Sequence, residues 1–180
     1  DNFESGIQTW MATDTLWQPG TPSGLVINNA FSGATAWSTC NNGFTQPLFS
    51  FVESPCFDFS DLSMPQVEFR YFVNIEPGDG VYIQYTTDNY MWSNIGNVGD
   101  TLNWYNSISY GNSWTGDTMT SWKLARHAIP QLAGAPYVKF RFVYNWPVPI
   151  GTKTVYDGFA FDDFSVYERP DYDLAMIAMD

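Results

Sequence analysis

Two adjacent carboxylates near the end of the chain lie in an otherwise apolar stretch, where their charge needs an explanation. The segment 157–168 is rich in the aromatic and β-branched residues typical of a strand: Phe159, Phe161, Phe164 and Val166. Asp162 and Asp163 lie in the middle of it. A cation or a set of backbone donors must compensate at least one of the two, because an uncompensated buried aspartate costs several kcal/mol in desolvation. Alternation along a strand predicts that the two side chains point to opposite faces.

Two further carboxylates follow the same pattern in distant parts of the sequence. Glu4 comes directly after Phe3, and Asp58 lies between two phenylalanines. These residues come from the start, the middle and the end of the chain, so only the fold could bring them together. A hard cation such as calcium, which takes oxygen ligands from several segments, would explain them. Separate carboxylates, each solvated or hydrogen-bonded, are the alternative.

An aromatic-rich passage predicts a second kind of site. Residues 97–122 are rich in Asn, Gly, Ser and Thr, yet they carry several large rings. Aromatic faces stack on sugar rings, and the amides and hydroxyls of such a passage can hydrogen-bond to sugar hydroxyls. We therefore expect a ligand-binding surface here, and the alternative is that the rings only cover one face of the fold. The expected ligand-binding residues are Trp104, Tyr105, Tyr110 and Trp114.

The two cysteines, Cys40 and Cys56, lie in a segment rich in Asn, Gly, Ser and Pro. A disulfide between them would stabilise the fold by roughly 3 kcal/mol and would imply an oxidising, extracytoplasmic compartment. Two buried free thiols are the alternative. Their spacing does not match a zinc motif.

Composition limits the partners. The 180 residues carry 19 acidic and 7 basic side chains, for a formal charge of −12. Such a chain repels nucleic acid and anionic membranes and favours cations or neutral ligands, such as calcium and sugars. The sequence has no apolar run long enough to span a membrane. Because it begins with neither Met nor a signal peptide, we expect it to be a processed piece of a larger protein.

The apolar pattern predicts an all-β domain. Segments 66–73, 80–85 and 137–144 alternate as strands do, and the last of them has Lys139 and Arg141 on one face and its apolar residues on the core face. Segment 121–129 fits either a strand or one helical turn. Eight or more short strands predict an antiparallel β-sandwich of the jelly-roll kind over residues 1–168. Residues 169–180 are expected to be a linker and the start of a following domain, or a tail that packs back on this one.

The order of several short motifs covers nearly all of residues 1–168. It resembles a MAM-like jelly roll with a galactose-binding-like sandwich, in the version found in secreted and surface proteins of Bacteroidetes and related to their cleaved-adhesin modules. The motifs are Phe3-Glu4 with Trp10, Ser32-Gly33 to Ala36-Trp37, the stretch 54–60, Val81-Tyr82-Ile83-Gln84-Tyr85 with Asp88 and Trp92, the passage 122–134, the stretch 138–142, and Gly158-Phe159-Ala160-Phe161-Asp162-Asp163.

The resemblance implies a noncatalytic, secreted or cell-surface module for adhesion, protein association or glycan binding, attached to neighbouring domains. It also implies a structural calcium ion, with Glu4, Asp58 and one of Asp162 or Asp163 as ligands and Asp1 as a further candidate. The alternative is an accessory domain of a secreted polysaccharide-degrading or proteolytic enzyme, or such an enzyme itself. The chain has no GxSxG, HExxH, P-loop or dinucleotide motif that would favour an enzyme.

Overall fold

The computed structural model describes residues 1–40, 49–108, 111–145 and 156–169. Its strands form two five-stranded sheets in which every pairing is antiparallel. Sheet A has the order β1 (Met11–Ala12), β4 (Phe49–Glu53), β9 (Lys139–Asn145), β6 (Gly80–Thr86) and β7 (Ser93–Asn94). Sheet B has the order β2 (Gln18–Gly20), β3 (Ala36–Ser38), β10 (Gly158–Glu168), β5 (Pro65–Asn74) and β8 (Lys123–Ala128).

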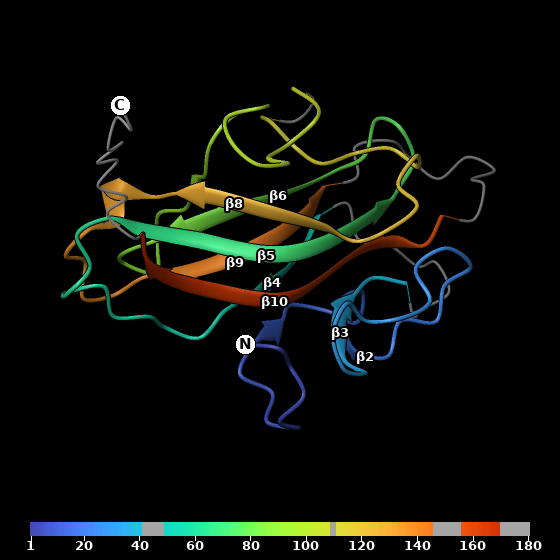
Figure 1. The fold of residues 1–180 in the computed structure, drawn as a ribbon, viewed down its shortest axis with the longest axis horizontal. Coiled ribbons are helices and arrows are strands. Elements are labelled where there is room, and N and C mark those ends of the chain that lie inside the picture. Colours follow the sequence, from blue (N-terminus) through green and yellow to red (C-terminus); the bar gives the residue numbers. More distant parts are fainter. Residues whose placement is uncertain (41–48, 109–110, 146–155, 170–180) are drawn as a thin grey trace, which may run out of the picture.

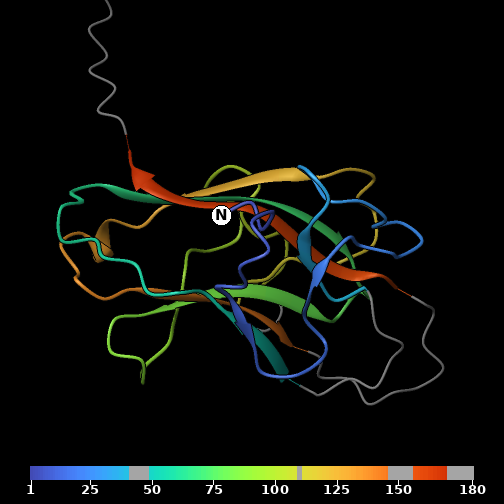
Figure 2. The same ribbon diagram turned by 90° about the horizontal axis from the view of Figure 1, so that it is seen from below.

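The two sheets pack face to face as layers. Figure 1 shows β8, β5 and β10 in front of β6, β9 and β4, and Figure 2 shows the two layers edge-on. Among the described residues the only helical element is the 3₁₀ turn η1 (Pro130–Leu132). The predicted antiparallel β-sandwich of the jelly-roll kind is therefore confirmed. No helix in the described part is long and apolar enough to cross a membrane.

The space between the sheets is filled mainly by aromatic rings. Phe142 of β9 stacks on Phe161 of β10 with ring centroids 4.1 Å apart, and it meets Phe69 of β5 edge-on at 4.9 Å. All three side chains are fully buried. Aromatic pairs in stacked and edge-to-face geometry stabilise a core beyond the burial of their area. The alternation predicted for 66–73, 80–85 and 137–144 thus forms β5, β6 and β9.

The structure defines segment 121–129, the surroundings of Asp58 and the end of the last strand. The ambiguous segment 121–129 forms the edge strand β8, paired with β5 over Lys123–Ala128. Asp58 lies outside the strands, and its neighbour Phe57 forms only a single bridge, with Val138. Arg169 still donates its backbone N–H to the carbonyl of Met64 at 2.9 Å, so the sandwich continues one residue past 168. The remainder of the predicted linker, 170–180, lies outside the described residues.

A β-bulge in β10 changes the direction of the paired aspartates. Phe161 and Phe164 both point into the core although two residues separate them, and the pairing with β5 shifts register between Asp162 and Ser165. Asp163 has φ 50°, a left-handed conformation typical of such a bulge. The prediction that the two carboxylates face opposite sides is therefore wrong. Both reach Ser32, whose N–H donates to Asp162 at 3.0 Å and whose hydroxyl donates to Asp163 at 2.8 Å.

Candidate ligand-binding face

The fold brings several of the predicted metal ligands to one segment, residues 31–35. The fully buried Asp162 carboxylate accepts hydrogen bonds from the backbone N–H groups of Phe31, Ser32 and Asp163, at 3.0, 3.0 and 2.7 Å. Burial raises the pKa of Asp162 to about 6, against the opposite effect of these hydrogen bonds. Backbone donors thus compensate the buried carboxylate, which is one of the two solutions that the sequence required.

Glu4 binds the same segment from the other end of the chain. Its Oε1 accepts hydrogen bonds from the N–H groups of Ala34 and Thr35 at 3.0 and 2.6 Å. Gly33 has φ 57°, and a Cβ at that position would collide with the Glu4 carboxylate. The amino group of Asp1 donates to the carbonyl of Phe164 at 2.5 Å, which places Asp1 beside the same part of β10.

Asp58 is separate from this group. Its exposed side chain accepts hydrogen bonds from the N–H and the hydroxyl of Ser60, and these bonds lower its pKa. Within the described residues, no group of three Asp, Glu, His or Cys side chains is placed to hold a metal ion. The calcium site implied by the resemblance therefore stays a prediction.

The aromatic residues expected to bind a ligand lie in the core. Trp104, Tyr105 and Trp114 are 0%, 4% and 1% exposed, and Tyr110 is outside the described residues. Their polar atoms have internal partners: the indole N–H of Trp104 donates to the carbonyl of Ile95 at 3.0 Å, and that of Trp114 donates to Asn103 at 3.0 Å. A ring whose polar atom is already satisfied is stable in a core. Trp104, Tyr105 and Trp114 therefore do not form the expected exposed surface, and the expectation for Tyr110 stays a prediction.

The predicted disulfide is also absent. Cys40 is half-buried just after β3 in sheet B, whereas Cys56 is exposed beyond β4 in sheet A, and both are free thiols. Burial raises the pKa of the Cys40 thiol. The two residues follow strands of different sheets, so closeness in sequence does not bring them together. The oxidising compartment inferred from a disulfide loses its support.

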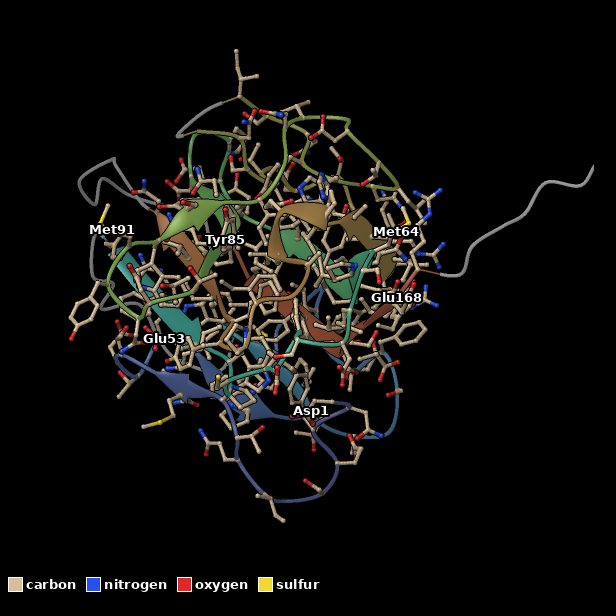
Figure 3. All side chains as sticks on the ribbon, turned by 90° about the vertical axis from the view of Figure 1, so that its left-hand side faces the viewer. Asp1, Glu53, Met64, Tyr85, Met91 and Glu168 are labelled. Carbon is tan, nitrogen blue, oxygen red and sulfur yellow. The ribbon has the colours of Figure 1, made fainter. Side chains whose placement is uncertain are left out.

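A different set of residues forms a candidate binding surface, which we call the Arg141 face. It is the side of β4, β9 and β6 that points away from sheet B, together with the residue that precedes β7. On β9 the core side carries Phe140 and Phe142, so alternation places Arg141 on the outer side. In Figure 3 the molecule is seen from the end, with Glu53 and Met91 labelled on the left and Met64 and Glu168 on the opposite side. The Arg141 face consists of Phe49, Phe51, Glu53, Gln84, Trp92, Lys139 and Arg141.

Strand register aligns these side chains in two rows across the sheet. Glu53 and Gln84 flank Arg141 in one row, and in the next row the partly exposed Phe51 lies beside the buried Val143 and Tyr82. Side chains directly opposite each other on neighbouring strands are close enough to interact. Aromatic and polar groups therefore lie side by side, as a surface that stacks on a sugar and hydrogen-bonds to it requires.

The guanidinium of Arg141 is the centre of this face. It lies 4.1 Å from the ring centroid of Trp92 and 4.6 Å from that of Phe51. Its Nε donates a hydrogen bond to Oε1 of Gln84 at 2.8 Å, and the amide of Gln84 donates in turn to Asn94 at 2.8 Å. Two aromatic contacts and a hydrogen-bonded chain fix the plane of the guanidinium.

The hairpin beside this face exposes two large apolar side chains. Tyr90 and Met91 are 85% and 75% exposed. The turn itself is firmly built, because the carboxylate of Asp88 accepts hydrogen bonds from both of their N–H groups at 2.8 Å and Asn89 has φ 63°. A defined turn that presents apolar side chains to solvent is typical of a contact surface.

Two cavities lie elsewhere on the molecule. One of about 350 Å³ lies on sheet B beside Arg126, Tyr167 and Arg169, and one of about 310 Å³ lies beside Glu4. The guanidinium of Arg126 is already paired with the carboxylate of Glu68 at 2.6 Å. Cavities of this size suit a small molecule, whereas an open sheet face has room for a polymer chain.

The sequence predicted some of the residues of the Arg141 face. It predicted that Lys139 and Arg141 share the outer face of their strand, which the structure confirms. It did not predict that Phe51 and Trp92 cover the same guanidinium, because their positions follow from strand order rather than from spacing.

Solved structures with a similar fold include an adhesin domain and a carbohydrate-binding module. The K1 cleaved adhesin domain of Lys-gingipain from Porphyromonas gingivalis W83 is similar, with a TM-score of 0.54 and 14% identity over 94% of this chain and 97% of that one. The module TmCBM61, solved in complex with β-1,4-galactotriose, has a TM-score of 0.54 and 13% identity over 93% and 94%. These likenesses show the fold alone. Searches of protein-family models and of curated proteins give no match.

Proposed function

We propose that this chain is a noncatalytic binding module that binds a glycan on the Arg141 face. The observation that carries the proposal is the guanidinium of Arg141 held between the rings of Trp92 and Phe51. Fixed rings supply apolar area at little cost in conformational entropy, and the neighbouring amides and cation supply hydrogen bonds to hydroxyl groups. The solved complex of the similar TmCBM61 with a galactotriose supports the choice of a glycan as the ligand.

The cellular setting is part of the same proposal. We place the chain in a secreted or cell-surface protein, as one module among others of the same polypeptide, because a similar structure is a cleaved adhesin domain. A protein ligand is the second candidate. The exposed Tyr90 and Met91 favour it, since large exposed apolar side chains are common anchors of protein interfaces.

Affinity electrophoresis of the chain in gels that contain single polysaccharides tests the proposal. We expect at least one polysaccharide to retard the parent protein, and the same polysaccharide not to retard a double variant that lacks the aromatic contacts, Trp92→Ala with Phe51→Ala. Normal mobility of the folded parent protein in every neutral and acidic polysaccharide would contradict glycan binding.

We further propose that a calcium ion stabilises the junction of the N-terminal segment with β10. The proposal is supported by donor chemistry, because the carboxylates of Glu4 and Asp163 are hard oxygens that both contact segment 31–35. When bound, the ion would tie the first residues of the chain to the last strand.

Calcium is therefore expected to raise the melting temperature relative to excess chelator. At a calcium concentration roughly 100-fold above Kd, the shift should be about 5 °C or more. Differential scanning calorimetry measures it, and Glu4→Gln should remove most of the shift. Asp58→Asn is the matched control and should keep it. Equal melting temperatures of the parent protein with calcium and with chelator would rule out the ion.

A further inference from the structure

We infer that the glycan bound by the Arg141 face carries carboxylate groups, as a uronic-acid polysaccharide does, and that Arg141 binds one of them. This inference rests on the proposed glycan binding. It depends on the local charge of the face, on the geometry of the guanidinium and on the contrast with other arginines of the same chain.

The local charge of the face differs from that of the whole chain. The chain carries 19 acidic and 7 basic residues, yet β9 places Lys139 and Arg141 next to each other on this face. Glu53 is the acidic neighbour of both residues: it is paired with Lys139 at 3.2 Å and lies directly opposite Arg141 on β4. The two basic side chains and Glu53 together leave one net positive charge on this face. A net positive patch on a strongly acidic molecule attracts an anion to this place.

The guanidinium of Arg141 has N–H groups that can donate to a ligand. Its Nε bonds to Gln84, but among the described residues neither Nη group has a hydrogen-bond acceptor. The rings of Trp92 and Phe51 hold its plane, so the remaining N–H groups form a fixed fork. Such a fork matches the two oxygens of a carboxylate in a bidentate pair, a geometry that sugar hydroxyls reproduce less well.

The environment of Arg141 also favours an added anion. Partial burial lowers the pKa of Arg141, against the opposite effect of the neighbouring Glu53 carboxylate. Arg126 on sheet B shows the opposite case, because a carboxylate of the same chain, Glu68, already binds its guanidinium at 2.6 Å and raises its pKa. A ligand carboxylate would supply to Arg141 what Glu68 supplies to Arg126.

Isothermal titration calorimetry with three defined probes tests the inference: trigalacturonate, neutral β-1,4-galactotriose and a sulfated galactan oligosaccharide. We expect the parent protein to bind trigalacturonate roughly tenfold or more tightly than either of the others, the factor that a charge-assisted bidentate pair contributes. Arg141→Gln should abolish that preference. Arg70→Gln is the matched control, because Arg70 also lies over an aromatic ring, that of Phe31 at 4.3 Å, but on sheet B.

The outcomes separate the inference from the proposal on which it rests. Binding of galactotriose as tightly as trigalacturonate overturns the carboxylate assignment and leaves glycan binding intact. Equal binding of the sulfated probe also overturns it, since any anion would then suffice. A preference that survives Arg141→Gln overturns the role of that residue. If no probe binds and no polysaccharide retards the protein, glycan binding fails as well.

Discussion

Replacing Trp92 with alanine is expected to weaken glycan binding by roughly 30-fold or more while the protein stays folded. Trp92 is a partly exposed ring of the Arg141 face and also holds the Arg141 guanidinium at 4.1 Å. Its removal takes away a stacking surface and frees the guanidinium, and truncating an aromatic anchor of a binding site typically costs about 2 kcal/mol or more. Calorimetric titration with the polysaccharide fragment that binds the parent protein measures the loss.

Two variants make this result specific. Trp92→Phe keeps a ring and should recover much of the affinity. Phe31→Ala removes a ring that lies under Arg70 on the opposite sheet, so affinity should stay at the parent level. Unchanged affinity in Trp92→Ala, or an equal loss in Phe31→Ala, would place the binding surface elsewhere.

Asp162→Ala is expected to lower the free energy of unfolding by about 3 kcal/mol or more, with little direct effect on the Arg141 face. The buried carboxylate accepts three backbone N–H groups, from Phe31, Ser32 and Asp163. Each buried donor left without a partner costs about 1–3 kcal/mol. Urea denaturation in calcium-free buffer measures the loss.

A matched change at an exposed carboxylate provides the control for this prediction. Asp58 accepts only from Ser60 among the described residues and lies in solvent, so Asp58→Ala should leave the unfolding midpoint nearly unchanged. Similar midpoints for the parent protein and Asp162→Ala would show that the backbone clamp on segment 31–35 contributes little to stability.

The sequence predicted the sandwich well because the strand signal is local. In a stretch such as 138–142, apolar and basic side chains alternate, and the burial of the apolar face fixes which side meets the core. The direction of Asp163 could not be predicted in this way, because a bulge adds one residue to the strand and breaks the alternation. The spacing of Phe161 and Phe164, two core residues separated by two positions, was the signal that a bulge was present.

Trp104 and Trp114, which were expected on the surface, are buried in the core. Trp104 and Trp114 lie in a polar passage, which suggested exposure, yet each indole N–H reaches a backbone carbonyl and each ring packs against Phe69. Local composition cannot reveal such partners, because they come from distant strands, as in the bridge of Trp114 with Val81 of β6. For the same reason the sequence predicted only part of the Arg141 face. The alternation of one strand places Lys139 and Arg141 on the same side, but their contacts come from β4 and from the hairpin before β7.

The central claim, that the ligand binds on the outer side of sheet A, is tested most directly by NMR titration of the ¹⁵N-labelled protein with trigalacturonate and with β-1,4-galactotriose. We predict that the largest shift changes fall on the indole N–H of Trp92 and on the side-chain amides of Gln84 and Asn94, while the indole signals of the buried Trp104 and Trp114 change little. Shift changes concentrated around segment 31–35 or on β8 of sheet B, with the Trp92 signal unmoved at saturation, would contradict the account.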